Sequence, residues 1–205
     1  MKSKENATLS QLPLNINIKG KRALIVGGGE VACRKLKTLL AAGAAVYLVA
    51  PDMVPEITTL LSTGEIEARV GKFEFNDLKG AFLIVAATDD HEVNKQIALE
   101  ATQRGILVAV TDAPDNGNCT FPAVLRRGGL EISVSTGGRS PAFASLVRDV
   151  VASVIGEDYG VALERVATER EKLLTERNGS TYNKKIMYSI AKQMITALNK
   201  HKESL

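Results

Sequence analysis

The amino-acid sequence predicts an α/β fold, in which a Rossmann-type doubly wound parallel sheet is followed by a small strand-containing region and a C-terminal helical part. Short apolar runs alternate with segments of helical periodicity over the first half of the chain. A glycine turn joins the first apolar run directly to the first helical segment. Beyond residue 114 the pattern changes to two short strands and three amphipathic helices. The 205 residues, 45% of them hydrophobic, can form one good core and a smaller appendage.

The first strand, turn and helix have the arrangement of a dinucleotide site. Residues 22–26 form an apolar run, and the turn after it reads Gly27-Gly28-Gly29, with Ala32 three residues further on. The first glycine allows a tight turn, the third lets a phosphate approach the backbone, and the small Ala32 permits close packing of helix on strand. Free N–H groups at the start of the helix favour a pyrophosphate. A glycine triplet outside this context would predict only a turn.

The second strand, residues 45–50, indicates which nicotinamide dinucleotide is bound. Asp52 follows it, 20 residues beyond Ala32, close to where an acidic group meets the adenosine ribose hydroxyls. Residues 46–68 contain no Lys or Arg that could neutralise a 2′-phosphate, so the sequence favours NAD over NADP. The alternative is that Asp52 caps a helix beginning near Val54.

Three further strands complete the predicted sheet, at residues 66–70, 81–87 and 106–110, with a helix at about 92–104 before the last of them. Ligands of such sheets lie at the carboxyl ends of the strands. Thr88 and Asp89 follow the fourth strand and Asp112 follows the fifth, so these residues are expected at the site. The alternative for Asp112 is a turn residue that bonds its own backbone ahead of Pro114.

The second half of the chain begins with a turn-rich loop and two strands, at residues 121–126 and 130–135. Another glycine turn follows, with Ser140 as N-cap and Pro141 at the first helical position. The helix after it carries one apolar stripe, formed by Phe143, Leu146, Val147, Val150, Val151 and Val154. Two more helices are predicted at about residues 159–174 and 182–202.

Composition excludes several classes of protein. The net charge of +3, the aromatic content of 4% and the absence of Trp do not indicate a nucleic-acid partner. No apolar stretch reaches the ~18 residues of a membrane span, and the first ten residues lack a secretory apolar segment, so a cytoplasmic protein is expected. The two cysteines and two histidines have neither disulfide-framework nor metal-ligand spacing, so no metal site is predicted.

Five segments, in order along the chain, resemble the precorrin-2 dehydrogenase family, the N-terminal module of siroheme synthase. They are residues 12–29, 87–90, 112–114, 121–122 and 135–141, and the resemblance covers about residues 12–155. It implies NAD-dependent oxidation of precorrin-2, a tetrapyrrole, to sirohydrochlorin by a homodimer. It also implies three parts: an NAD-binding Rossmann domain at 1–113, a dimerisation region at 114–155 and a C-terminal helical domain at 156–205.

The resemblance also implies roles for individual residues. Asp112 matches the aspartate proposed as catalytic in the family, and the reaction needs a base because a proton leaves together with a hydride. Positions that line the NAD site in the family match Glu30, Val31, Pro51 and Asp52. The substrate carries eight carboxylates, for which the turn at 136–140 offers Thr136, Gly137, Arg139 and Ser140. A plain capped helix start is the alternative for this turn.

Three functional alternatives stay open at the level of sequence. Some relatives also insert Fe²⁺ into the product, and the sequence leaves this activity undecided. A non-catalytic NAD-sensing module would need neither an acid after the fifth strand nor a basic helical domain, and this chain has both: residues 161–205 hold nine Lys or Arg against five Glu. A dehydrogenase for a small hydroxy acid would usually have a His or Lys beside the nicotinamide.

Overall fold

The computed structural model describes residues 11–176 and 184–203. Their contacts divide the chain into two compact units, with the division between Phe121 and Pro122. This division lies eight residues beyond the end of the Rossmann domain expected from the sequence, because residues 114–121 pack on the first unit.

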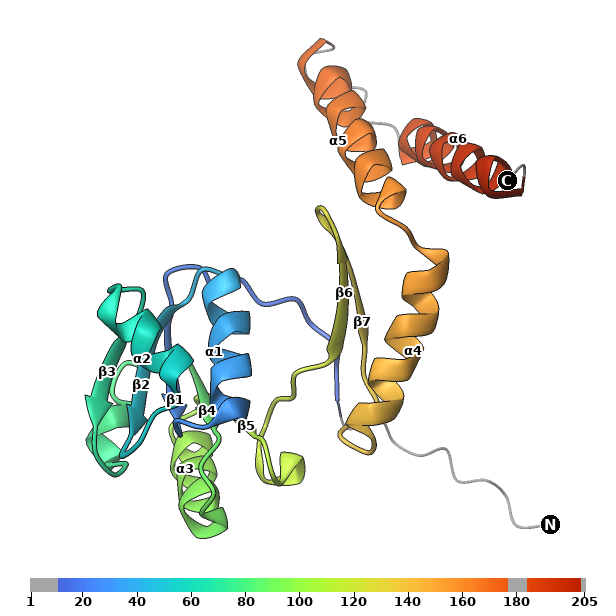
Figure 1. The fold of residues 1–205 in the computed structure, drawn as a ribbon. Helices are drawn as coiled ribbons and strands as arrows, with labels where there is room; N and C mark the ends of the chain where they lie inside the picture. The colour runs from blue at the N-terminus through green and yellow to red at the C-terminus, as the bar shows by residue number, and fades with distance from the viewer. Residues whose placement is uncertain (1–10, 177–183, 204–205) are drawn as a thin grey trace, which may run out of the picture. The chain divides into compact units, whose positions relative to one another are not determined.

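The first unit contains a five-stranded, entirely parallel sheet (Figure 1). Its strands follow the order β3-β2-β1-β4-β5, so the strand order reverses between β1 and β4. The bounds are Arg22–Val26 for β1, Ala45–Ala50 for β2, Glu67–Val70 for β3, Leu83–Ala86 for β4 and Leu107–Val110 for β5. The reversal is the point at which ligands bind in sheets of this kind, so it directs attention to the carboxyl ends of β1 and β4.

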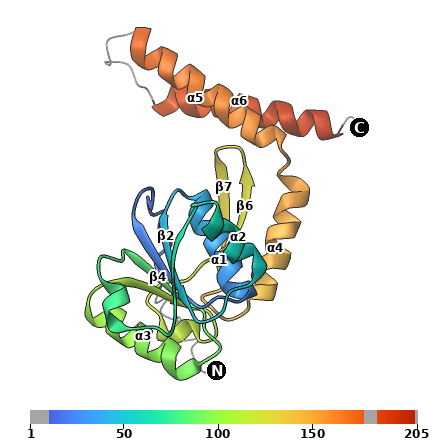
Figure 2. The same cartoon turned by 60° about the vertical axis from the view of Figure 1, so that its left-hand side comes forward.

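Helices cover both faces of this sheet (Figures 1 and 2). They are α1 Glu30–Ala41, α2 Pro55–Ser62 and α3 His91–Gln103, with short 3₁₀ turns at Phe75–Leu78 and Pro114–Asn116. The two short turns were not among the predicted elements. The observed helices and strands confirm the doubly wound α/β fold.

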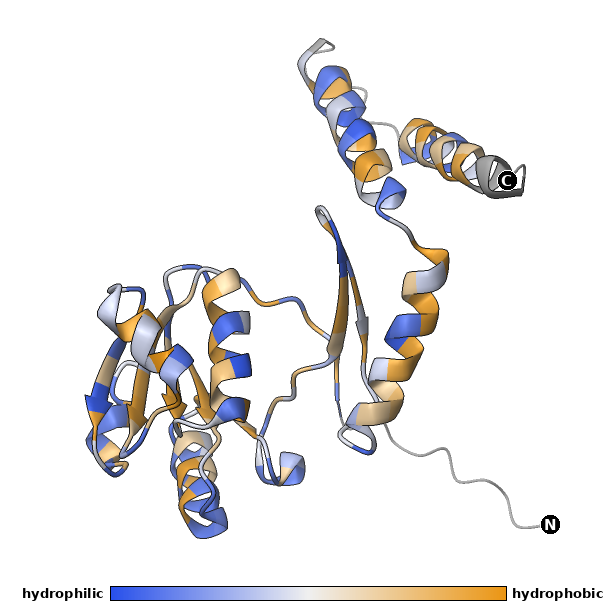
Figure 3. Ribbon diagram, in the orientation of Figure 1, coloured by the Kyte–Doolittle hydropathy of each residue, from blue (hydrophilic) through white to orange (hydrophobic). Residues whose placement is uncertain are grey.

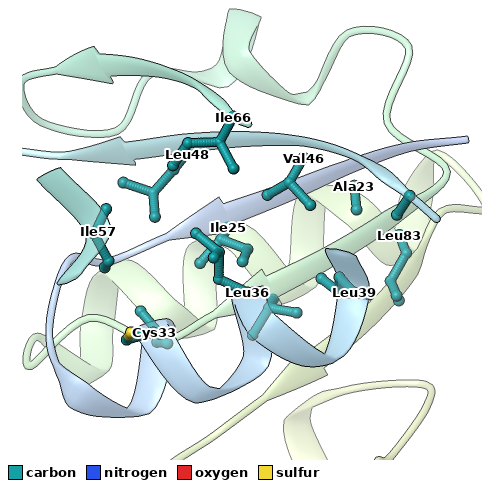
Figure 4. Close-up of a cluster of buried hydrophobic side chains, with 14 of the residues drawn as sticks. Ala23, Ile25, Cys33, Leu36, Leu39, Val46, Leu48, Ile57, Ile66 and Leu83 are labelled. Carbon is teal, nitrogen blue, oxygen red and sulfur yellow. The ribbon is translucent and has the colours of Figure 1, made fainter. Parts of the chain in front are cut away.

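The core of the first unit lies in two layers, because alternate residues of β1 point to opposite faces. Ile25 packs with Leu36 of α1 and Ile57 of α2 on one face (Figure 4). Leu24 packs with Ile97 of α3 on the other face. All five side chains are fully buried. Burying each of them contributes about 1.5–3 kcal/mol, which explains why β1 reads as an unbroken apolar run.

The second unit is a β-hairpin with three helices. Strands β6 Ala123–Arg127 and β7 Leu130–Val134 pair antiparallel, and α4 Pro141–Val154 packs on both of them. Helices α5 Asp158–Glu176 and α6 Lys184–Glu203 pack against each other. The turn between β6 and β7 packs closely against α5, since a Cβ on Gly160 would lie 2.5 Å from the carbonyl oxygen of Arg127.

The apolar stripe predicted for α4 exists, but much of it faces solvent within this unit. The hydropathy colours of Figure 3 show a helix rich in apolar residues. Ala144 is buried, whereas Phe143 is 60% exposed and Leu146 is 64% exposed. Val150 and Val154 continue the exposed stripe, at 66% and 58%. We call these four residues the α4 stripe. Four large apolar side chains along one helix form a surface that commonly binds a partner.

Among the described residues, no helix is long and apolar enough to cross a membrane. Cys33 and Cys119 are both free thiols.

Candidate active site

The turn between β1 and α1 is built so that only glycine fits at its first two positions. Gly27 has a φ of +125°, and a Cβ there would lie 2.1 Å from the carbonyl oxygen of Ala87. A Cβ on Gly28 would lie 1.9 Å from the carbonyl oxygen of Asp52. The turn is thus clamped between the segments that follow β4 and β2, and bonds from Gly27 N to Val49 O and from Val54 N to Gly28 O, both 2.9 Å, hold it there.

The third glycine faces open space instead. Gly29 is the N-cap of α1, and a Cβ built on it meets nothing within 4 Å. No side chain caps this helix start, so the first N–H groups of α1 keep their hydrogen-bonding capacity. Ala32 is fully buried against the sheet, while Glu30 and Val31 are exposed. An open backbone beside uncapped N–H groups is the geometry that a phosphate requires.

The segment after β2 carries two exposed residues, Pro51 and Asp52. Asp52 does not cap the following helix, because the N-cap of α2 is Val54 and no side chain bonds the first turn. The alternative that Asp52 is a helix cap is therefore wrong. Its backbone carbonyl packs against Gly28, which keeps Asp52 beside the glycine turn, where an acid can meet a ribose.

Asn94, in the first turn of α3, connects the ends of β4 and β5. It is 1% exposed, and its Nδ2 donates to the Thr88 carbonyl at 2.9 Å and to Asp112 Oδ1 at 3.0 Å. Its Oδ1 accepts from the Thr88 backbone N–H at 3.1 Å and from the Thr88 hydroxyl at 2.8 Å. Thr88 is therefore held within the protein, while Asp89 next to it is exposed.

Asp112 lies at the end of β5 with both carboxylate oxygens held by α3. Asn94 donates to Oδ1, and His91 Nδ1 contacts Oδ2. The side chain of Asp112 is 20% exposed and that of His91 is 81% exposed. Partial burial raises the pKa of Asp112, but hydrogen bonds from His91, from its own backbone N–H and from Asn94 outweigh burial and leave the pKa below its ordinary value. An ionised, anchored carboxylate at this edge can accept a proton.

The sequence did not indicate Asn94, and it predicted His91 as an exposed residue in the first turn of a helix. The exposure is confirmed, and the contact with Asp112 is new. Asp90 caps α3 by accepting from the backbone N–H groups of Glu92 and Val93. This cap fixes the start of α3, and so it sets the positions of His91 and Asn94 relative to β5. Their spacing of three residues, which puts both on one helix face, was the available signal.

The predicted substrate turn lies in the second unit and is held largely by its own hydrogen bonds. Ser140 caps α4, since its hydroxyl accepts from Phe143 N at 3.2 Å. Thr136 bonds Ser140 twice through its hydroxyl, and its carbonyl accepts from the backbone N and from Nε of Arg139. Gly137 N donates to the Ser135 hydroxyl. These backbone N–H groups are engaged within the turn, so Arg139, which is exposed, is the residue of the four best able to meet a carboxylate.

Among the side chains that the structure describes, no group of three or more His, Cys, Asp or Glu could hold a metal ion.

Two protein families and several known proteins are similar to this chain. The family described as putative NAD(P)-binding matches residues 14–123, and the family described as sirohaem biosynthesis protein central matches residues 127–153. A siroheme synthase from Chromobacterium violaceum is 43% identical over 148 residues, which are 72% of this chain and 32% of that protein. One from Photorhabdus laumondii is 36% identical over 165 residues, 80% of this chain and 35% of that protein. The chain thus spans about a third of the length of these relatives.

A solved structure is similar over nearly the whole chain. It is described as SirC, precorrin-2 dehydrogenase, with 29% sequence identity and a TM-score of 0.73. The similarity covers 90% of this chain and 89% of that one.

Proposed function

The chain belongs to the family described as putative NAD(P)-binding, and we propose that it oxidises precorrin-2 to sirohydrochlorin with NAD as the hydride acceptor. The observation that carries the proposal is the anchored Asp112 carboxylate, which is linked through Asn94 and Thr88 to the segment that clamps Gly27. A proton acceptor and a dinucleotide turn therefore share one edge of the sheet, as a reaction that removes a proton and a hydride requires.

The residues around the turn fit a nicotinamide dinucleotide. Gly27 and Gly28 bring the backbone close, and Gly29 with the start of α1 leaves room and free N–H groups for the pyrophosphate. Glu30, Val31 and Asp89 are exposed and complete the surface that we assign to the cofactor, and the buried Ala32 serves it by letting α1 pack close to the sheet. When bound, the nicotinamide supplies the hydride acceptor. The part of Asp112 is to take the proton onto a carboxylate oxygen and to release it to water afterwards.

We assign NAD, not NADP, on the charges around the end of β2. Asp52 is exposed there next to Pro51, and no Lys or Arg occurs from residue 46 to residue 68. A carboxylate accepts hydrogen bonds from the ribose hydroxyls of NAD but repels the 2′-phosphate of NADP.

The tetrapyrrole is the proposed substrate because it would meet a positively charged part of the chain. Arg139 presents an exposed guanidinium, supported by the turn that contains Thr136, Gly137 and Ser140. The C-terminal residues 161–205 carry an excess of positive charge. Both features favour a polycarboxylate over a neutral small substrate.

We further propose that two copies of the chain associate through residues 114–155. The support is the α4 stripe, whose four apolar side chains are each more than half exposed within the unit. Water contact with such a stripe is unfavourable by about 25 cal/mol per Å², so a second copy that covers it would be stabilised. The free thiols Cys33 and Cys119 are typical of a reducing compartment, and the cytoplasm is the proposed location.

An anaerobic assay tests the proposed reaction. Purified protein is mixed with precorrin-2 and NAD, and the absorbance change to sirohydrochlorin is followed. We expect conversion that depends on both the protein and NAD. A non-catalytic NAD-sensing module, the main alternative, would bind NAD without conversion. Addition of Fe²⁺ or Co²⁺ afterwards answers the separate question of metal insertion, since the metallated product has its own spectrum.

A further inference from the structure

The Asp112 carboxylate is held from two sides by residues of one helix turn. Asn94 and His91 lie three residues apart on α3, so both side chains project from the same face toward the end of β5. We propose that His91 and Asn94 are positioning residues that fix the Asp112 carboxylate as the proton acceptor. This inference rests on the proposed function, because it assigns these residues to the same proton transfer.

Asn94 holds the carboxylate from the buried side. Its amide has one orientation available, because Oδ1 accepts from two groups of Thr88 and Nδ2 donates to the Thr88 carbonyl and to Asp112. A flipped amide would place Nδ2 against the Thr88 N–H, and both are donors. The direction of the bond to Asp112 Oδ1 is therefore set by the backbone at the end of β4, the strand beside the dinucleotide turn.

His91 holds the carboxylate from the solvent side. Its Nδ1 meets Oδ2, and the ring can donate there either as the imidazolium or as the neutral tautomer with the proton on Nδ1. Other charged residues on the surrounding segments are Asp89, Asp90, Glu92, Lys95 and Asp115. Of these carboxylates, Asp90 already accepts the hydrogen bonds that cap α3. The hydrogen bond and the charge of His91 both lower the pKa of Asp112.

Asn94 and His91 hold different oxygens of the Asp112 carboxylate, and this arrangement leaves the carboxylate able to accept a proton. In the step, a proton leaves the tetrapyrrole for a carboxylate oxygen of Asp112, while the hydride leaves for the nicotinamide. The two carboxylate oxygens have about four lone pairs and accept three hydrogen bonds, so one lone pair is left and the carboxylate can take the proton without losing a hydrogen bond. His91 lowers the pKa of Asp112 and keeps its carboxylate correctly turned before the step, at the border with solvent.

The test uses His91 because its exposed side chain can be removed without disturbing the core, whereas loss of Asn94 would also remove the side chain that bonds the backbone N–H and carbonyl of Thr88. We compare the full-length wild type with His91→Ala, with His91→Asn, which returns a neutral donor near the Nδ1 position, and with Lys95→Gln. The last variant removes a positive charge from the same helix at an exposed position. The pH profile of kcat/KM and the ¹³C titration of the Asp112 carboxyl are measured for each.

We expect His91→Ala to move the acid limb of the profile and the Asp112 titration midpoint to higher pH, and to lower kcat about tenfold, the effect of one hydrogen bond to a charged group. His91→Asn should recover part of kcat, and Lys95→Gln should match the wild type. Identical Asp112 midpoints in wild type and His91→Ala would overturn the inference. A wild type that does not convert precorrin-2 refutes the proposed function instead. In that case the ¹³C titration still tests whether His91 lowers the pKa of Asp112.

Discussion

At the scale of single residues, the three glycines of the β1–α1 turn have different roles. Gly27 and Gly28 are needed by the fold, because carbonyl oxygens occupy the places that their Cβ atoms would take. Gly29 is not needed by the fold, since the space around its Cβ is empty and its φ is −85°. The sequence pattern assigned the tight turn to Gly27 and the phosphate to Gly29, and gave Gly28 no separate role. The clamp by Asp52 explains Gly28, and it depends on a contact 24 residues away.

These different roles predict that alanine at position 28 lowers stability, whereas alanine at position 29 weakens NAD binding. Gly28→Ala should lower the free energy of unfolding by about 1–3 kcal/mol, the usual cost of forcing a group into a filled space. Gly29→Ala should leave that energy nearly unchanged but weaken NAD binding about tenfold or more, since a methyl group would stand where the phosphate approaches. Urea denaturation and NAD titration measure the two quantities. Equal NAD affinity in wild type and Gly29→Ala would contradict the assigned phosphate position.

Asp52 carries the predicted preference between the two dinucleotides. Asp52→Ser should narrow the ratio of the Kd values for NADP and NAD by about tenfold, because it removes the charge that repels the 2′-phosphate. Binding is measured by fluorescence titration with both reduced cofactors. Asp115→Ser, which removes an exposed carboxylate of another segment, is the control and should leave the ratio unchanged. An unchanged ratio in Asp52→Ser would remove Asp52 from cofactor selection.

At the scale of elements, the strands and most helices could be predicted because local sequence dictates them. The strand β1 is buried on both faces and reads as a continuous apolar run, and α4 begins at the Ser140 cap and Pro141 as expected. The 3₁₀ turn Phe75–Leu78 was not predicted, since it depends on Asp77, which bonds Arg69 and the backbone of Glu74. The Asn94 network was missed for the same reason: it joins residues 18 positions apart.

The α4 stripe illustrates a different limit. Periodicity predicts that a helix has an apolar face, but it does not tell whether that face is covered by the same chain. In this unit the hairpin covers Ala144, and the stripe stays exposed. The proposal that a second copy covers the stripe is therefore tested by measuring the oligomeric state of the protein.

A charge placed in the middle of the α4 stripe should break the proposed homodimer. Leu146→Asp would put a carboxylate into an apolar interface, which should raise the dimer Kd about thirtyfold or more, the effect of losing a central contact. Sedimentation velocity at micromolar concentration measures it, with circular dichroism to verify folding. Ala142→Asp, an exposed site on α4 outside the stripe, is the matched control. A monomeric wild type, or a Leu146→Asp variant that stays dimeric, would contradict the proposal.

At the scale of the whole molecule, the chain joins a dinucleotide unit to a unit with a basic helical part. The first unit brings together the glycine turn and Asp112 through one parallel sheet and one buried Asn. The second unit supplies Arg139, the α4 stripe and helices α5 and α6. We propose that the first unit removes the proton and directs the hydride. The second unit recognises carboxylates of the substrate and binds the partner copy.

The most direct test of the central claim is the stoichiometry of the reaction in wild type and in Asp112→Asn. NADH and sirohydrochlorin are measured together under anaerobic conditions with precorrin-2 and NAD. The account predicts that the wild type forms them in equal amounts, and that Asp112→Asn binds NAD normally but turns over about 10²–10⁴-fold more slowly, the usual contribution of a general base. Absence of coupled NADH formation in the wild type, or undiminished turnover in Asp112→Asn, would contradict it.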